Sequence, residues 1–99
     1  AFYSPDFIVR SKNCVYLVET KAKGQISHPN VQRKKMAAVN WCANINRLPV
    51  EKRVNREWHY VLLSETTFYE WRDKNARMAE MLDFARLREQ TGAVQANLL

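Results

Sequence analysis

Two carboxylates and one ammonium group near the start of the chain have the types and spacing to share one site. They are Asp6, Glu19 and Lys21. Side chains alternate across a β-strand, so Glu19 and Lys21 would lie on one face of a strand. If a two-residue turn at Lys12-Asn13 joins two antiparallel strands, position 11 pairs with position 14, and counting outward places Asp6 opposite Glu19. The spacing therefore predicts that the three groups converge at one end of a β-hairpin.

This register also assigns the hairpin side chains to two faces. The candidate site shares its face with Ile8, and the opposite face is expected to pack against a core layer. A shift of one residue would exchange the two faces and break the arrangement. The core-facing residues are predicted to be Phe7, Val9, Tyr16 and Val18.

The chemistry that such a group supports is binding of a hard divalent cation. Two carboxylates facing each other across strands repel, so they need a cation nearby to stay ionised. Mg²⁺ prefers carboxylate oxygens, backbone carbonyls and waters, and the backbone carbonyl of Thr20 is a natural further ligand. Such an ion activates water and neutralises charge on a phosphate, while Lys21 would orient the attacking water or stabilise the transition state.

The alternative is that Glu19-Thr20-Lys21 is a solvated strand face with a weak ion pair. Two observations favour the site. The triplet ends the apolar run Val15–Val18, where a surface pair is less expected, and Pro5-Asp6 begins the preceding strand.

The elements that must position these groups follow from the apolar pattern. Residues 7–10 and 14–21 are rich in β-branched and aromatic residues and are predicted strands, separated by a polar turn at 11–13. Residues 22–29 contain Gly, Ser and Pro and are expected to form a loop.

A helix is expected next. Pro29 or Asn30 would open it, and residues 46–49 would close it. The polar and basic stretch 47–57 is predicted to be a loop. The buried stripe of the helix is expected to comprise Val31, Ala38, Trp41, Cys42 and Ile45.

A strand and a second helix complete the pattern. Residues 58–63 are almost continuously apolar, which suits a strand buried on both faces. The helix is predicted to run from about 68 to 90, with Thr67 and Glu70 as a capping box and Gly92 as its stop. Its apolar stripe would comprise Phe68, Trp71, Met78, Leu82 and Ala85.

The resulting order is β-β-α-β-α, a mixed α/β layer with its strands in one sheet. Ninety-nine residues form at most one domain, so 1–99 is treated as a single unit with a C-terminal helix at about 68–90. An apolar fraction of 46% is ordinary for a globular protein and argues against disorder throughout.

The charge balance favours an anionic partner. Sixteen Lys and Arg against ten Asp and Glu give a net charge of +6, and a basic surface attracts phosphate backbones without reading sequence. Arg33, Lys34 and Lys35 and the stretch from Arg47 to Arg56 are candidates for phosphate contact. A solvated basic surface is the alternative.

Other features indicate the setting of the protein. Cys14 and Cys42 match no zinc-site spacing, so buried free thiols in a reduced compartment are favoured over a disulfide. No apolar run approaches the ~20 residues that span a bilayer, and a signal peptide is absent from the start of the sequence, so a cytoplasmic location is expected.

The chain begins without Met and enters strand-like sequence at once, which suggests a piece of a larger protein. Structural roles are expected for the isolated histidines and tryptophans, namely His28, His59, Trp41, Trp58 and Trp71.

Two segments carry a resemblance to a known family. Ser4-Pro5-Asp6-Phe7-Ile8-Val9 and Tyr16-Leu17-Val18-Glu19-Thr20-Lys21 resemble the signature of the PD-(D/E)xK nuclease superfamily. More narrowly, the ordered set resembles the C-terminal endonuclease region of type III restriction enzyme Res subunits. That set adds Lys34-Lys35, Ala37-Ala38, Trp41-Cys42 and the Trp58 strand, and it covers roughly residues 2–65.

The resemblance implies a role for each matching residue. Asp6 and Glu19 would bind Mg²⁺, for which Mn²⁺ would substitute, and Lys21 would be the catalytic lysine. Gln32 or Lys35 would be an auxiliary polar residue near the phosphate, with plain helix surface as the alternative. The implied reaction is hydrolysis of phosphodiester bonds in double-stranded DNA.

The resemblance also implies a restriction-endonuclease-like fold and further partners. The superfamily core usually has a helix and a strand before the Pro-Asp strand, and this chain starts after them, so a partial domain is expected. The implied partners are the helicase/ATPase remainder of a parent protein and a modification subunit. Two other functions stay open: a non-catalytic DNA-binding or assembly domain on a nuclease-like fold, and a related repair or phage-defence nuclease.

Overall fold

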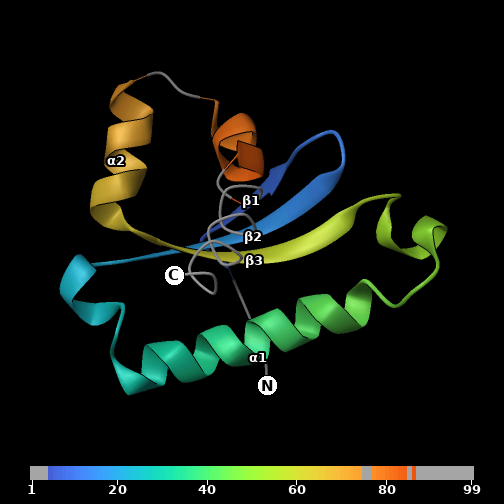
Figure 1. Cartoon of the computed structure of the whole chain (residues 1–99), viewed down its shortest axis with the longest axis horizontal. Coiled ribbons are helices and arrows are strands. Elements are labelled where there is room, and N and C mark those ends of the chain that lie inside the picture. The colour runs from blue at the N-terminus through green and yellow to red at the C-terminus, as the bar shows by residue number, and fades with distance from the viewer. Residues whose placement is uncertain (1–4, 75–76, 85, 87–99) are drawn as a thin grey trace, which may run out of the picture.

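One mixed three-stranded sheet organises the fold, seen in a computed structural model that describes residues 5–74, 77–84 and 86 (Figure 1). The strands are β1 (Phe7–Arg10), β2 (Cys14–Lys21) and β3 (Glu57–Ser64), in the spatial order β1-β2-β3. β1 runs antiparallel to β2, and β3 runs parallel to it. The α/β class expected from the sequence is confirmed at this coarse level.

The hairpin register is the predicted one. Phe7 pairs with Val18 and Arg10 pairs with Val15, and the amide of Ser11 donates to the carbonyl of Cys14 at 2.9 Å. Lys12 and Asn13 therefore form the turn. Each strand residue consequently lies on the sheet face that the sequence assigned to it.

A helical crossover joins β2 to β3, as a parallel pair requires. A short 3₁₀ turn (Lys23–Gln25) leads to α1 (Pro29–Ile45). Pro29 occupies the first turn, where its missing N–H costs nothing, and the preceding His28 Nδ1 accepts from the amide of Asn30 at 3.1 Å. The helix bounds agree with the prediction.

The end of α1 is fixed to the start of β3. The Asn46 amide group donates to the Trp58 carbonyl at 2.8 Å and accepts from the Trp58 amide at 2.7 Å, so it acts as a strand partner would. The intervening stretch, predicted to be a loop, contains one 3₁₀ turn (Val50–Arg53). These two bonds help to set the register of β3 on the sheet.

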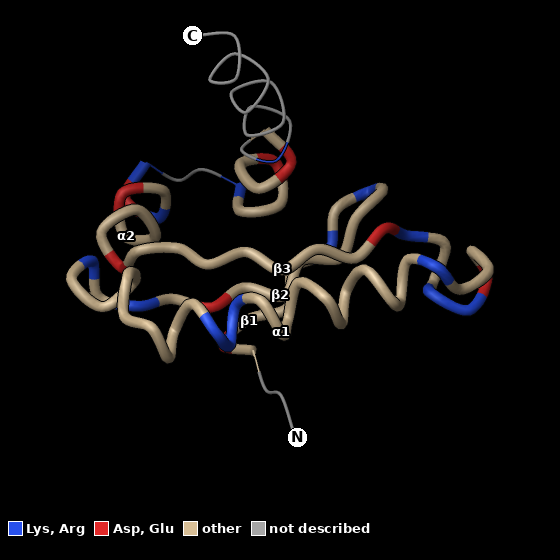
Figure 2. Tube along the Cα trace, turned by 60° about the horizontal axis from the view of Figure 1, so that its bottom comes forward, with Lys and Arg blue, Asp and Glu red and all other residues tan. Residues whose placement is uncertain are grey.

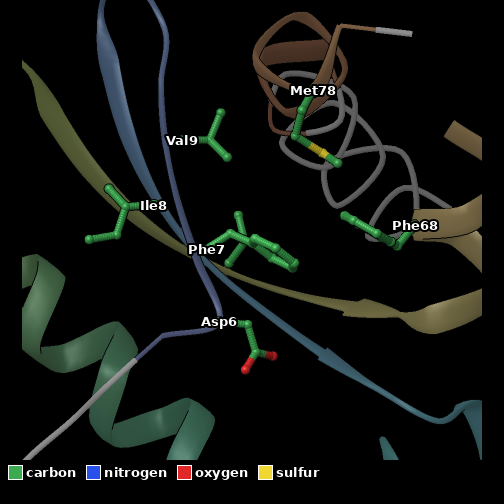
Figure 3. Close-up of a pocket in the computed structure, with 7 residues that line it drawn as sticks. Asp6, Phe7, Ile8, Val9, Phe68 and Met78 are labelled. Carbon is green, nitrogen blue, oxygen red and sulfur yellow. The ribbon is translucent and has the colours of Figure 1, made fainter. Parts of the chain in front are cut away.

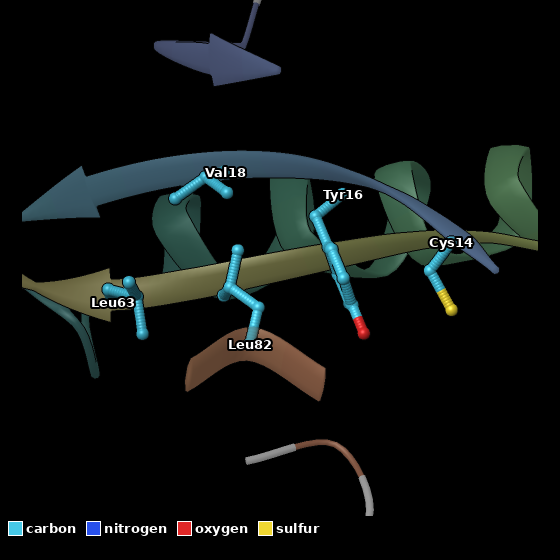
Figure 4. Close-up of a cluster of buried hydrophobic side chains, with 5 residues drawn as sticks. All are labelled: Cys14, Tyr16, Val18, Leu63 and Leu82. Carbon is cyan, nitrogen blue, oxygen red and sulfur yellow. The ribbon is translucent and has the colours of Figure 1, made fainter. Parts of the chain in front are cut away.

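Helices cover both faces of the sheet (Figure 1). α1 lies against one face, and the other is covered by α2 (Glu65–Asp73) and a further helical stretch at 78–84. Figure 4 shows the core on this second face, with Leu82 pointing at the sheet. The buried cluster comprises Cys14, Tyr16, Val18, Leu63 and Leu82.

The predicted C-terminal helix is wrong in its start, its cap and its continuity. α2 begins at Glu65, and its cap is Ser64, whose hydroxyl accepts from the Thr67 amide at 3.1 Å. It ends at Asp73, and helix resumes at 78. The interruption lets Trp71, Met78 and Leu82 all reach one small core, which a straight helix of that length would overshoot. Positions 85 and 87–92, including the predicted stop at Gly92, lie outside the described residues.

Two burial predictions are also wrong. Trp41 is 48% exposed and meets Trp58 edge-on at 6.1 Å, while Ala38 and Cys42 are the buried residues of α1. β3 is buried only at Leu63 and is otherwise half-buried or exposed, because in the described part of the chain it has a neighbour on one side alone. No helix within the described ranges is both long and apolar enough to cross a membrane.

Candidate functional site

Glu19 and Lys21 lie together at the end of the central strand. The Lys21 ammonium is 3.8 Å from Oε1 of Glu19, and the two side chains are 34% and 16% exposed respectively. Strand alternation puts both on the α1 face of the sheet, away from Val18 in the core. A carboxylate beside a cation presents oxygens of the kind that hard metal ions accept.

Tyr60 is a third member of this group. Its hydroxyl donates to Oε2 of Glu19 at 2.5 Å. The parallel register pairs Leu17 with Tyr60 and Glu19 with Leu62, so Tyr60 lies on the same face as Glu19 and close to it. Glu19 is thus oriented by Tyr60 through one oxygen and faces Lys21 with the other.

Asp6 lies just before β1 at the same end of the sheet. Continuing the register of β1 and β2 by one residue places Asp6 opposite Glu19. Its Oδ2 accepts from the Thr20 amide at 2.9 Å and from the Thr20 hydroxyl at 3.4 Å. Figure 3 shows the carboxylate pointing away from Phe68 and Met78. The side chain is exposed, so its other oxygen can meet a ligand from solvent.

The geometry also favours the Thr20 carbonyl as a ligand. Hydrogen-bonded and non-hydrogen-bonded residue pairs alternate along an antiparallel ladder. Ser11 and Cys14 form a hydrogen-bonded pair, and counting from it in steps of two residues makes Pro5 and Thr20 the last such pair. Pro5 has no N–H to donate. Among the residues that the structure describes, the strand pairing therefore leaves the Thr20 carbonyl without a backbone donor from the β1 side, next to Asp6.

The candidate auxiliary residues lie on the first half of α1. Gln32 donates to the Ile26 carbonyl at 2.6 Å, which fixes the loop before the helix. Lys35 is half-buried and continues the stripe formed by Ala38 and Cys42. Arg33 and Lys34 are exposed. Since α1 runs back from the end of β2, these residues begin at the site's end of the sheet.

The donor set is of the hard-oxygen type, with two carboxylates and one backbone carbonyl, and the Lys21 ammonium group lies beside it. Carboxylates and carbonyls are ligands that Mg²⁺ and Mn²⁺ accept, so the residues fit such an ion. Within residues 5–74, 77–84 and 86, no group of three or more His, Cys, Asp and Glu side chains is gathered as a metal cluster. An ion here would therefore complete its coordination with water or substrate oxygens.

Sequence reasoning missed Tyr60. The strand itself was predicted, but its register on β2 was not, because a parallel pair is joined by a long crossover that leaves the alignment open. Once β3 is aligned with β2, an aromatic hydroxyl two positions before Leu62 is a candidate partner for Glu19.

An open pocket of about 470 Å³ lies near Asp6 on the other side of the sheet (Figure 3). Phe7 stacks on Phe68 there, with ring centroids 5.2 Å apart. The lining is apolar apart from Asp6 and comprises Asp6, Phe7, Ile8, Val9, Val18, Phe68 and Met78.

A separate polar cluster surrounds Tyr16 on the core face. The Tyr16 hydroxyl donates to Asp83 at 2.5 Å and accepts from Arg86 at 3.3 Å. Burial, followed by the bond to Asp83, raises the Tyr16 pKa above its ordinary value. His59 stacks on the Tyr16 ring at 5.8 Å, and burial lowers the His59 pKa more than the nearby Glu57 raises it. This cluster lies across the sheet from Glu19 and contributes nothing to the candidate site.

Comparisons were made with protein-family models, with curated proteins and with solved structures. None of the three gives a match to this chain.

Proposed function

We propose that this chain is a Mg²⁺-dependent DNA endonuclease module of the PD-(D/E)xK type, with a restriction-endonuclease-like fold. The observation that carries the proposal is the grouping of Glu19, Lys21 and Asp6 at one end of the hairpin. Asp6 is bonded to Thr20, the residue between the other two. The resemblance to the cleavage region of type III restriction enzymes suggests a cytoplasmic restriction system as the setting.

Each residue has a defined task in this proposal. Asp6, Glu19 and the Thr20 carbonyl would hold the ion, and Tyr60 would orient Glu19. Mg²⁺ would polarise a phosphate oxygen and lower the pKa of a bound water. Lys21, 3.8 Å from Glu19, would place its ammonium against the attacking water or the developing negative charge. Gln32, Lys35, Lys34 and Arg33 would contact the phosphate backbone from α1.

The test compares the wild-type chain with its Lys21→Ala variant on supercoiled plasmid, in Mg²⁺ or in Mn²⁺. The same pair is compared in any longer protein that contains the chain. We expect nicking by the wild type, loss of nicking by the variant, and retention of calorimetric Mn²⁺ binding by the variant. Equal nicking by both proteins would reject Lys21 as the catalytic lysine.

The chief rival is a DNA-binding domain without catalysis. It predicts duplex binding that survives Lys21→Ala and requires no metal. Absence of Mn²⁺ binding by the wild type, together with unchanged duplex binding in EDTA, would favour that rival.

A further inference from the structure

Basic side chains gather at the end of the sheet opposite the candidate site. The turn between β1 and β2 meets the segment before β3 there: Arg56 donates to the Ser11 carbonyl at 2.9 Å, and the Glu57 amide donates to the Asn13 carbonyl at 2.9 Å. Figure 2 shows Lys and Arg at both the turn and the segment. We call this surface the basic end; its residues are Lys12, Arg47, Lys52, Arg53 and Arg56.

These basic side chains outnumber the two carboxylates of the same region, Glu51 and Glu57. None of the five forms an ion pair within the described residues. The nearest acidic strand residue, Glu57, lies instead 3.1 Å from Nε2 of His59. Five cations against these two carboxylates leave an excess of positive charge, which favours an anionic partner.

Two of the arginines are held in fixed orientations. Arg53 donates to the carbonyls of Leu48 at 3.1 Å and Arg56 at 3.0 Å. Arg56 donates to the carbonyls of Ser11 and Val54, the latter at 3.2 Å. Carbonyl acceptors fix a guanidinium without neutralising it, and each guanidinium has five N–H groups. The remaining donors are available to phosphate oxygens.

The backbone between these arginines is strained. Val54 has φ 53° and Asn55 has φ 57°, and a β-branched residue in the left-handed region is a true outlier. Strain that the surrounding contacts enforce concentrates at functional segments. The Arg53 and Arg56 bonds bracket the strained residues, and Lys52 is exposed beside them.

We infer that the basic end is a second DNA-contacting surface, which binds phosphates of a double-stranded DNA backbone away from the scissile bond. The choice of DNA as partner rests on the proposed function. The eight residues from Cys14 to Lys21 span roughly 23 Å along β2, which corresponds to about seven base pairs of duplex. The basic end thus holds the duplex at a distance from the site and does not take part in the chemistry.

The test measures the salt dependence of binding to a 20-base-pair DNA duplex in EDTA, so that no metal contributes. The variant is Arg47→Ala/Lys52→Ala, since both side chains are exposed and neither holds the strained turn. The matched control is Lys74→Ala/Arg77→Ala, which removes the same charge from exposed positions around the end of α2. Circular dichroism verifies that both variants are folded.

Each phosphate contact contributes about −0.9 to the slope of log K against log salt concentration. We expect the variant to lose about two units of slope and at least tenfold in affinity near 0.1 M salt, with the control close to wild type. A variant that binds like the control overturns the inference. So does tighter binding of the wild type to duplex RNA or to phosphatidylserine vesicles than to DNA.

The result separates this inference from the proposed function. Lys21→Ala leaves the basic end unchanged, and sites this far apart act independently. If the wild type does not nick plasmid but Arg47→Ala/Lys52→Ala lowers the salt-dependence slope, the nuclease proposal is rejected and the DNA surface is retained. If the wild type nicks plasmid and the slope is unchanged in Arg47→Ala/Lys52→Ala, the nuclease proposal is retained and the DNA surface is rejected.

Discussion

The Tyr60 hydroxyl donates a 2.5 Å hydrogen bond to Oε2 of Glu19, across 41 positions of sequence. This bond connects β3 to the candidate site on β2, so the geometry of the site depends on the pairing of the two strands. Outer groups that orient a metal-binding carboxylate typically contribute 10–100-fold to metal affinity.

Replacing Tyr60 with Phe removes this hydrogen bond and keeps the ring. We expect Mn²⁺ affinity to fall about tenfold and the free energy of unfolding to fall by about 1.5 kcal/mol. Calorimetric titration and urea unfolding measure the two effects. Unchanged Mn²⁺ affinity in Tyr60→Phe would show that Glu19 is placed without Tyr60.

Asp6→Asn separates the charge of Asp6 from its structural bond. An asparagine oxygen can still accept from the Thr20 amide, which Asp6 now binds at 2.9 Å, but it brings no negative charge. We expect a normal fold with Mn²⁺ binding and nicking reduced by at least tenfold. Asp6→Ala is the companion variant, because it removes both the charge and the bond. Metal binding that is lost only in Asp6→Ala would assign Asp6 a purely structural role.

Stability is expected to fall in mild acid because of His59. Burial lowers its pKa below the ordinary 6.5, against the opposing effect of Glu57. The unfolded chain therefore binds a proton more readily than the folded chain just below pH 6.5, and the stabilisation present above that pH is lost as the pH falls toward the folded pKa. The charges of Arg86 and Asp83 also act on the His59 pKa: Arg86 lowers it and Asp83 raises it. Urea unfolding at pH 5 and pH 7.5 measures the change, and His59→Phe, which cannot titrate, should lose less stability than wild type between these two values.

Cys42 is expected to resist thiol reagents in the folded protein. It is buried on α1, and burial raises its pKa to about 11, which leaves little thiolate at pH 8. The structure confirms that Cys14 and Cys42 are free and buried. Mass spectrometry after iodoacetamide treatment should find Cys42 unmodified in native buffer and modified in urea. Rapid labelling in native buffer would contradict the packing of α1 on the sheet.

The start of α2 gives a stability test with a clear contrast. Ser64 caps the helix through the Thr67 amide, so Ser64→Ala should cost about 1 kcal/mol. Thr67→Val loses only the contact with the Ser64 hydroxyl at 2.9 Å and should cost less. Thermal or urea unfolding compares the stabilities of the two variants. A larger loss of stability in Thr67→Val than in Ser64→Ala would indicate that Thr67 is the helix cap, as the sequence predicted.

Local patterns predicted the hairpin and the first helix well. The Lys12-Asn13 turn and the alternation of β2 fixed the register, and Pro29 marked the helix start. These features depend on residues a few positions apart, where turn chemistry and periodicity dominate.

Long-range features could not be predicted in the same way. The Tyr60–Glu19 bond depends on a parallel alignment that Asn46 and Trp58 help to set. The predicted C-terminal helix ends at Asp73 and resumes at 78, so that both parts reach the same small core. The size of this core cannot be predicted from residues that are neighbours in the sequence. Trp41 lies on the apolar stripe of α1 but remains 48% exposed, because its position relative to the sheet depends on how far α1 extends over β3.

β2 carries the core on one side and the candidate site on the other, so both depend on a single alignment. A slip of one position in the hairpin would turn the Glu19 charge to the core face and move Tyr16 to the α1 face, which makes the misaligned chain unstable as well as inactive. Loss of the site by misregistration would therefore be visible as a failure to fold. A library of hairpin variants sorted only for solubility would then already be enriched in chains with Asp6 and Glu19 opposite each other.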